Sequence, residues 1–159
     1  MKLSSDKVFQ ESLALGTAGE DIIYQYLIKY NSYVEDNRSK NHKVGTGPRL
    51  FGTEGSLVLP DFYCYNKNTD KGNFAIDVKV KNSVYTVKKE KCFTVDNKYE
   101  QYIRIVQIKK LDFLMMAFVF ENRNYFYRDS ECIGTTTFNN QYGTGLVYLF
   151  KQDVGKIRY

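Results

Sequence analysis

Apolar residues recur at mostly helical spacing over residues 7–30, which predicts an amphipathic N-terminal helix. Gly16 and Gly19 lie near its middle, so a break near Gly16 is left open. Residues 31–55 are rich in Asn, Lys and Gly and show little periodicity, which indicates an edge strand followed by a mobile loop. The positions that carry the helical pattern are Val8, Leu13, Leu15, Ile22, Ile23, Tyr26 and Leu27.

Two β-prone segments follow, and we expect them to pair as a hairpin. Residues 56–65 carry strand-forming side chains on both sides of Pro60, which predicts strand around a local irregularity. Polar turn residues at 66–73 lead into residues 74–81, where apolar and polar side chains mostly alternate. This alternation puts Phe74, Ile76, Val78 and Val80 on one face, and Ala75, Asp77, Lys79 and Lys81 on the other.

A second helix and another strand pair are expected further along the chain. Residues 84–95 indicate a short irregular piece, after which Asp96 is a candidate cap for a helix over residues 98–109. Residues 114–120 are an apolar run of strand length, and residues 124–128 can pair with them after an Asn-rich turn.

The C-terminal residues 135–159 predict turns and one strand around residues 146–150. The order helix, hairpin, helix and strands predicts an α/β fold with a mixed sheet. With 159 residues, 43% of them hydrophobic, the chain is long enough for one compact core, so we expect a single domain over residues 1–159.

Composition also limits where the protein is expected to work. No apolar run approaches the roughly 20 residues of a membrane-spanning helix, so we expect no membrane span. The first residues lack the apolar stretch and cleavage site of a secretory signal, and we therefore expect a cytoplasmic protein.

Cysteine and histidine offer little for catalysis or zinc binding. Cys64, Cys92 and Cys132 are odd in number and lack CxxC spacing, which fits reduced thiols better than a disulfide framework. His42 is the only histidine and lies in a polar segment, where a solvated side chain is the expected state. A Cys/His zinc site and histidine-based catalysis are therefore not expected.

A net charge of +5 favours an anionic partner, and nucleic acid is the commonest one for a small basic domain. A solvated lysine-rich face is the alternative explanation. The lysines that concentrate this charge are Lys79, Lys81, Lys88, Lys89, Lys91, Lys98, Lys109 and Lys110.

Candidate chemistry centres on Asp61, Asp77 and Lys79. Taken alone, the strand with Asp77 and Lys79 fits an edge strand with one solvated face. Asp61 follows Pro60 on the preceding strand, however, and a hairpin would bring its carboxylate beside Asp77. Two close carboxylates repel each other unless a cation lies between them, and oxygen ligands suit Mg²⁺ or Mn²⁺.

These residues resemble the PD-(D/E)XK nuclease superfamily, whose core motif corresponds to Pro60–Asp61 followed by Asp77–Lys79. The segment Gly16–Glu20 is similar to the helical glutamate motif that precedes the catalytic hairpin in many members. The predicted second helix and the strand after it look like those that close the core in resolvase-like members. The resemblance covers roughly residues 16–120 and implies a restriction-endonuclease-like core, a mixed central sheet flanked by helices.

The resemblance also implies a role for each site residue. Asp61 and Asp77 would hold Mg²⁺ or Mn²⁺, with the backbone carbonyl of Val78 as a further ligand. Glu20 would complete the site directly or through water, and Lys79 would position the nucleophile. The metal would neutralise charge on the scissile phosphate and activate a bound water for in-line attack, and the family analogy implies a 5′ phosphate product.

Basic residues near this site are candidates for contacts with the nucleic-acid backbone, with solvated side chains as the alternative. Tyr102 either approaches the site from the second helix or lies half-buried in the core. The candidates after the site are Lys81, Lys88, Lys89, Lys91, Lys98 and Arg104, and those in the polar loop before it are Arg38, Lys40, His42, Lys43 and Arg49.

The leading functional hypothesis is a DNA endonuclease: a branched-DNA resolvase, a nicking enzyme or a restriction-like nuclease of a phage or mobile element. Specificity would come from DNA shape, from a homodimer or from a partner, since a domain of this size leaves little room for a targeting module. One alternative is a noncatalytic nucleic-acid-binding module that retains the nuclease fold. The other is an unrelated small α/β protein in which the acids never meet.

Overall fold

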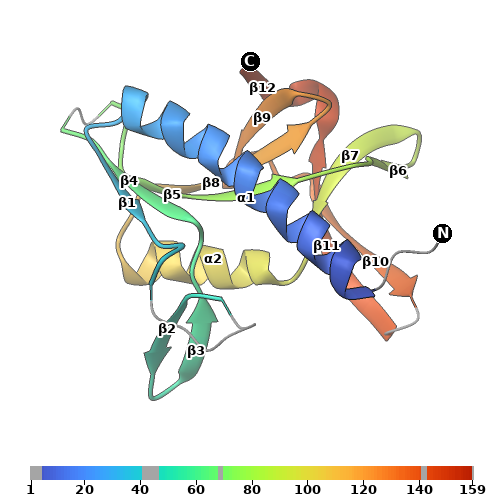
Figure 1. Ribbon diagram of the computed structural model, residues 1–159, viewed down its shortest axis with the longest axis horizontal. Helices are drawn as coiled ribbons and strands as arrows, with labels where there is room; N and C mark the ends of the chain where they lie inside the picture. Colours follow the sequence, from blue (N-terminus) through green and yellow to red (C-terminus); the bar gives the residue numbers. More distant parts are fainter. Residues whose placement is uncertain (1–4, 41–46, 68–69, 141–142, 159) are drawn as a thin grey trace.

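The computed structural model of the chain describes residues 5–40, 47–67, 70–140 and 143–158 (Figure 1). Within these ranges the chain forms two α-helices and three β-sheets. Neither helix is both long and apolar enough to cross a membrane. His42 and Lys43 lie outside the described residues.

A six-stranded sheet forms the centre of the fold, in the order β1-β4-β5-β8-β9-β12. β5 and β8 run parallel, and every other neighbouring pair is antiparallel. The predicted α/β fold with a mixed sheet is therefore confirmed, as are the hairpins β4–β5 and β8–β9. The strands are β1 (Tyr33–Asp36), β4 (Phe62–Tyr65), β5 (Phe74–Val80), β8 (Phe113–Phe120), β9 (Arg123–Arg128) and β12 (Lys156–Arg158).

The two helices cover opposite faces of this sheet (Figure 1). Ile23 and Leu27 of α1 (Ser5–Tyr30) pack against Ile76 and other buried side chains on one face. α2 (Lys98–Ile108) packs on the other face and forms part of the crossover that a parallel strand pair requires. α1 is continuous through Gly16, so no break occurs there; one glycine costs a helix only about 1 kcal/mol.

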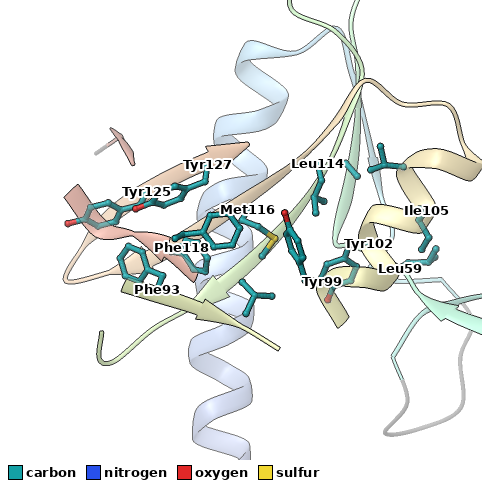
Figure 2. Packing of buried hydrophobic residues seen from close by; sticks show 14 of the residues in the cluster. Leu59, Phe93, Tyr99, Tyr102, Ile105, Leu114, Met116, Phe118, Tyr125 and Tyr127 are labelled. Atoms are coloured by element: carbon teal, nitrogen blue, oxygen red, sulfur yellow. The ribbon is translucent and has the colours of Figure 1, made fainter. Parts of the chain in front are cut away.

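The α2 side of the sheet holds a large aromatic core (Figure 2). Phe93 stacks on Phe118 with ring centroids 4.7 Å apart, and Tyr127 packs edge-on against both rings. Phe93 belongs to a second, four-stranded sheet, so this sheet and α2 share one core with the central sheet. In order, its strands are β10 (Gly134–Asn140), β11 (Gly143–Lys151), β7 (Glu90–Val95) and β6 (Tyr85–Val87).

Two sequence-based predictions, for residues 84–95 and for residues 135–159, are wrong. Residues 84–95 form the β6–β7 hairpin instead of an irregular piece, and residues 135–159 contribute β10, β11 and β12 instead of one strand. β10 is rich in Thr and Asn, so it lacks the apolar alternation that marks a half-buried strand. Its pairing along β11 stabilises it, and that contact does not show in its own sequence.

The polar segment before the hairpin contains more structure than expected. β1 is the predicted edge strand, and β2 (Arg49–Gly52) pairs with β3 (Gly55–Val58) in a separate two-stranded sheet. Pro60 lies in the short connection between β3 and β4, where the sequence predicted a local irregularity.

Candidate active site

Asp77 and Lys79 lie on a central strand of the six-stranded sheet. β5 is paired on both sides, and both of its faces are covered. Ile76 and Val78 face α1, whereas Ala75 faces the α2 core, so alternation puts Asp77 and Lys79 on the α2 side. Asp77 is only 2% exposed, and the interpretation of this strand as an edge strand with a solvated face is wrong.

Asp61 lies across the hairpin from Asp77. The β4–β5 register pairs Phe62 with Ile76, so the next position along the hairpin puts Asp61 opposite Asp77. Residues opposite each other on antiparallel strands have Cβ atoms about 4.5–5.5 Å apart. The Val78 N–H also donates a 2.8 Å hydrogen bond to Asp61 Oδ2, which fixes this carboxylate against β5. The two acids therefore meet, contrary to the hypothesis that they lie apart.

Lys79 forms an ion pair with Asp77, with Nζ 2.9 Å from Oδ2. Burial lowers the pKa of Lys79, but the negative charge of Asp77 more than offsets this and leaves the pKa raised. Lys79 is therefore held as a cation, and 29% of its side chain is exposed. Its ammonium also donates a 3.5 Å hydrogen bond to Tyr102 Oη.

Tyr102 approaches the site from α2, and its side chain is almost fully buried (Figure 2). The approach to the site is confirmed by the contact with Lys79, whereas the expected half-buried state is wrong because Tyr102 is only 2% exposed. Burial and the nearby charge of Asp77 raise the pKa of Tyr102, so it remains a neutral phenol.

Glu20 reaches the same region from α1, on the other face of the sheet. The preceding residue, Gly19, is buried where α1 crosses β5, and a Cβ atom there would collide with Val80. This close approach of helix and strand depends on glycine and sets the position of Glu20. Burial raises the pKa of Glu20 and Asp77 adds to the effect, while Arg38 opposes it.

The carboxylates of the site carry more negative charge than their surroundings neutralise. Burial raises the pKa of Asp61 well above its ordinary value, and the charges of Asp77 and Glu20 raise it further. The Val78 N–H and the charge of Lys79 offset only part of this. Asp77 Oδ2 is buried and has no hydrogen-bond partner besides its ion pair with Lys79. Such a site would be stabilised by an added cation.

The donor set suits a hard divalent cation. Asp61 and Asp77 supply carboxylate oxygens, and Mg²⁺ is commonly held by one or two carboxylates while it keeps several waters. Among the described residues, no three Asp, Glu, His or Cys side chains are gathered closely enough to hold a metal. The two aspartates would therefore be the protein's main ligands for one bound cation. Direct ligation by Glu20 and by the Val78 carbonyl stays a prediction.

Two residues that the sequence analysis did not single out support the acids. Asn37 is fully buried and donates through its side chain to Pro60 O at 2.9 Å, while its backbone N–H donates to Asp61 O at 2.9 Å. Gln101 of α2 accepts a 2.8 Å hydrogen bond from the Val58 N–H, which connects α2 to β3. Asn37 directly follows the predicted edge strand, and that position was its only signal.

The predicted nucleic-acid contacts come from several separate elements. Lys81 follows β5 and is half-buried, whereas Lys88 and Lys89 are exposed in the β6–β7 turn. Lys98 is exposed in the first turn of α2. Arg104, further along α2, forms a 3.0 Å ion pair with Glu54.

Two described cations of the preceding polar loop, Arg38 and Lys40, are engaged within the protein. Arg38 forms ion pairs with Asp21 and Asp36, at 2.7 and 2.9 Å. Lys40 is paired with Glu35 at 2.7 Å. Arg38 is therefore an organising residue of the fold near Glu20, in place of the loop contact that the sequence suggested.

Asp61 and Asp77 do not line any of five surface cavities of about 240–430 Å³ in the part of the chain that the structure describes. Asp61 and Lys79 are both partly exposed, whereas the Asp77 side chain is buried. Comparison of the chain with protein-family models, with curated proteins and with solved structures gave no match.

Proposed function

We propose that the chain is a metal-dependent DNA endonuclease of the PD-(D/E)XK superfamily with a restriction-endonuclease-like core. The observation that carries this proposal is the pairing of Asp61 with Asp77 across the β4–β5 hairpin, next to the cation Lys79. Asp61 thus lies beside Asp77 and Lys79, which follow it by 16 and 18 positions, in one partly exposed site.

The order of elements supports the proposal. A helix with Glu20 precedes the hairpin with Asp61 and Asp77, and α2 and the parallel strand β8 follow it. This is the order that the family resemblance implies. A noncatalytic binding module would gain nothing from buried acids where phosphates must approach, because like charges repel.

The chemistry proposed for the site needs a divalent cation. A Mg²⁺ or Mn²⁺ ion between Asp61 and Asp77 would neutralise charge on the scissile phosphate. Such an ion would relieve the raised pKa of Asp61 and would add a second positive partner to Asp77, whose buried Oδ2 is paired with Lys79, which is why the residues fit it.

Lys79 and Glu20 have complementary tasks in this proposal. Asp77 keeps Lys79 protonated, so Lys79 orients the attacking water and the phosphate by its charge and does not take up a proton. Glu20 comes from α1 and has a raised pKa, so it is the group best suited to accept a proton from that water.

The overall charge agrees with an anionic polymer as substrate. The net charge is +5, and Lys88, Lys89 and Lys98 are exposed. Phosphate contacts by such lysines would make binding fall with added salt.

The test is nicking of supercoiled plasmid and of branched DNA in Mg²⁺ or Mn²⁺. Wild-type protein is compared with Asp77→Asn and Lys79→Gln, and with Asp153→Asn as a control at an exposed acid outside the site. We expect metal-dependent cutting that both site variants abolish and the control retains.

DNA binding is measured beside cutting, by anisotropy of a labelled oligonucleotide, and thermal melting checks that each variant is folded. Wild-type protein that binds DNA and never cuts it, across substrates and metals, would contradict the proposal and favour the noncatalytic binding module.

A further inference from the structure

A groove opens beyond the end of β5, directly after Lys79. It is a cavity of about 410 Å³ between the end of β5 and the four-stranded sheet, and we call it the Lys81 groove. Its lining includes Val80, Lys81, Tyr85, Thr94, Phe138 and Val147.

Two aromatic rings of the groove face solvent. Tyr85 of β6 is 47% exposed and Phe138 of β10 is 39% exposed. Neither ring stacks on another aromatic ring within the described residues, whereas Phe93, Phe118 and other core rings stack repeatedly. The groove thus offers two partly exposed aromatic rings, and aromatic rings stack well on nucleobases.

Lys81 adds a cation that forms no close ion pair among the described residues. It lies two residues beyond Lys79, and its half-buried ammonium has no hydrogen bond or ion pair within the part of the chain described. Burial lowers the pKa of Lys81 and the charge of Lys79 lowers it further, while the charge of Asp96 opposes part of this, so Lys81 lies in the field of both Lys79 and Asp96. No acidic side chain lines the groove.

We propose that the Lys81 groove binds an unpaired segment of the DNA strand next to the scissile phosphate, with Lys81 on a phosphate and Tyr85 and Phe138 against bases. This inference rests on the proposed nuclease function and names its substrate class: DNA that is single-stranded on one side of the cut, such as a flap or a splayed branch. Fully paired duplex does not satisfy the groove, because its bases are stacked on one another and their faces are closed to a protein ring.

Binding is tested without metal, in EDTA, so that no strand is cut. Fluorescence anisotropy compares a labelled single strand, a splayed duplex and a blunt duplex of the same sequence. We expect wild-type protein to prefer the first two. In Tyr85→Ala this preference falls about 5- to 150-fold, the effect of losing one base–aromatic stack.

Tyr85→Phe keeps the ring and should keep the preference. The matched control is Tyr33→Ala, which removes an exposed tyrosine at the far end of β1 and should change nothing. Lys81→Ala should lower affinity for the unpaired strand and reduce its salt dependence by about one counterion, whereas Lys67→Ala in the β4–β5 turn should not.

Cutting is then measured on the same DNAs in Mg²⁺ or Mn²⁺, and we expect cuts within the unpaired segment or at its junction. Equal affinity of wild type for single strand and duplex, or an unchanged preference in Tyr85→Ala, would overturn the groove assignment even if the protein cuts DNA. A wild-type protein that shows the preference but cuts nothing supports the groove and contradicts the proposed hydrolysis alone.

Discussion

Two groups of acids, one strand apart, behave in opposite ways. Glu35 and Asp36 of β1 are fully paired: Lys40 and Tyr65 donate to Glu35, and Arg38 donates to both oxygens of Asp36. The hydrogen bond from Lys40 lowers the pKa of Glu35. At Asp36, burial raises the pKa, but the hydrogen bonds from Arg38 outweigh burial, so the pKa of Asp36 is lowered as well.

At the candidate active site the balance is reversed. Asp61 has a raised pKa because it is buried beside two other carboxylates, and Glu20 shifts in the same direction. Lys79 is the one cation paired with the Asp77 side chain in the described structure. The comparison shows that clustered acids alone do not indicate a functional site. Buried acids that lack sufficient positive partners are candidates for a functional site. An uncompensated carboxylate costs stability, and proteins keep such groups mainly where they bind or react.

The largest expected effect is on DNA cleavage, which should depend on the acids of the candidate site and not on the paired acids of β1. Asp61→Asn should lower metal-dependent DNA cleavage by about 10²–10⁴-fold, because a bound metal contributes several kcal/mol of transition-state stabilisation and Asp61 is one of its two proposed carboxylate ligands. Asp36→Asn, the same chemical change in the paired group, should keep cleavage within about tenfold. It should instead lose about 1–2 kcal/mol of unfolding free energy, because hydrogen bonds to Arg38 are weakened.

Initial nicking rates and urea unfolding curves check this pair of variants. Equal loss of activity in both would mean that the paired group also belongs to the catalytic machinery, and the comparison would fail.

The next effect concerns the cation that the site is expected to bind. Mn²⁺ or Mg²⁺ at a hundred times its dissociation constant should raise the unfolding free energy of wild-type protein by about 2.7 kcal/mol. Asp77→Asn should remove most of this stabilisation, and Asp36→Asn should retain it. Melting temperature against metal concentration measures the effect, and identical metal responses in wild type and Asp77→Asn would rule out the aspartate pair as the binding site.

Two glycines of α1 provide a smaller and opposite pair of effects. Gly19→Ala forces a methyl group against Val80 and should cost about 1–3 kcal/mol of stability, and it should also displace Glu20 and lower activity. Gly16→Ala meets no atom within 4 Å and should stabilise the helix by about 1 kcal/mol. Thermal unfolding and nicking of both variants are the measurements. A harmless Gly19→Ala would show that α1 can shift on β5 without affecting the site.

These glycines also show how far the sequence could predict the structure. Helical periodicity correctly located α1, and strict alternation located β5 with Asp77 and Lys79. The function of Gly19 could not be predicted, because the neighbour that requires it, Val80, lies 61 positions later in the chain. The same limit applies to Asn37, whose partners Pro60 and Asp61 lie in the connection between β3 and β4.

The solvent exposure of β5 was the hardest feature to predict from the sequence. An alternating strand has the same pattern whether its polar face meets water or a second buried layer. Here the layer on the α2 side is built from Tyr102 and the four-stranded sheet, whose Thr-rich strand β10 carries little hydrophobic signal. The buried state of Asp77 therefore depends on elements that the sequence analysis largely missed.

The smallest expected effect is the dependence of stability on pH in metal-free protein. The folded-state pKa of Asp61 is raised above the ordinary 3.8, so between those two values the folded protein holds a proton that the unfolded chain releases. The unfolding free energy therefore falls as pH rises through this window. Asp61→Asn should abolish that fall while it keeps the hydrogen bond from Val78, so its stability relative to wild type should increase as pH rises from 3.8 through this window.

Asp36 gives the opposite slope and serves as the internal control. Its folded-state pKa is lowered below 3.8, so its contribution is complete above that pH and is lost as pH falls through the lowered value. Asp36→Asn should thus differ from wild type at neutral pH and converge with it in acid. Urea unfolding in EDTA across this pH range measures both variants. Parallel curves for wild type and Asp61→Asn would mean that Asp61 is sufficiently compensated without metal, and the contrast between the two groups of acids would then disappear.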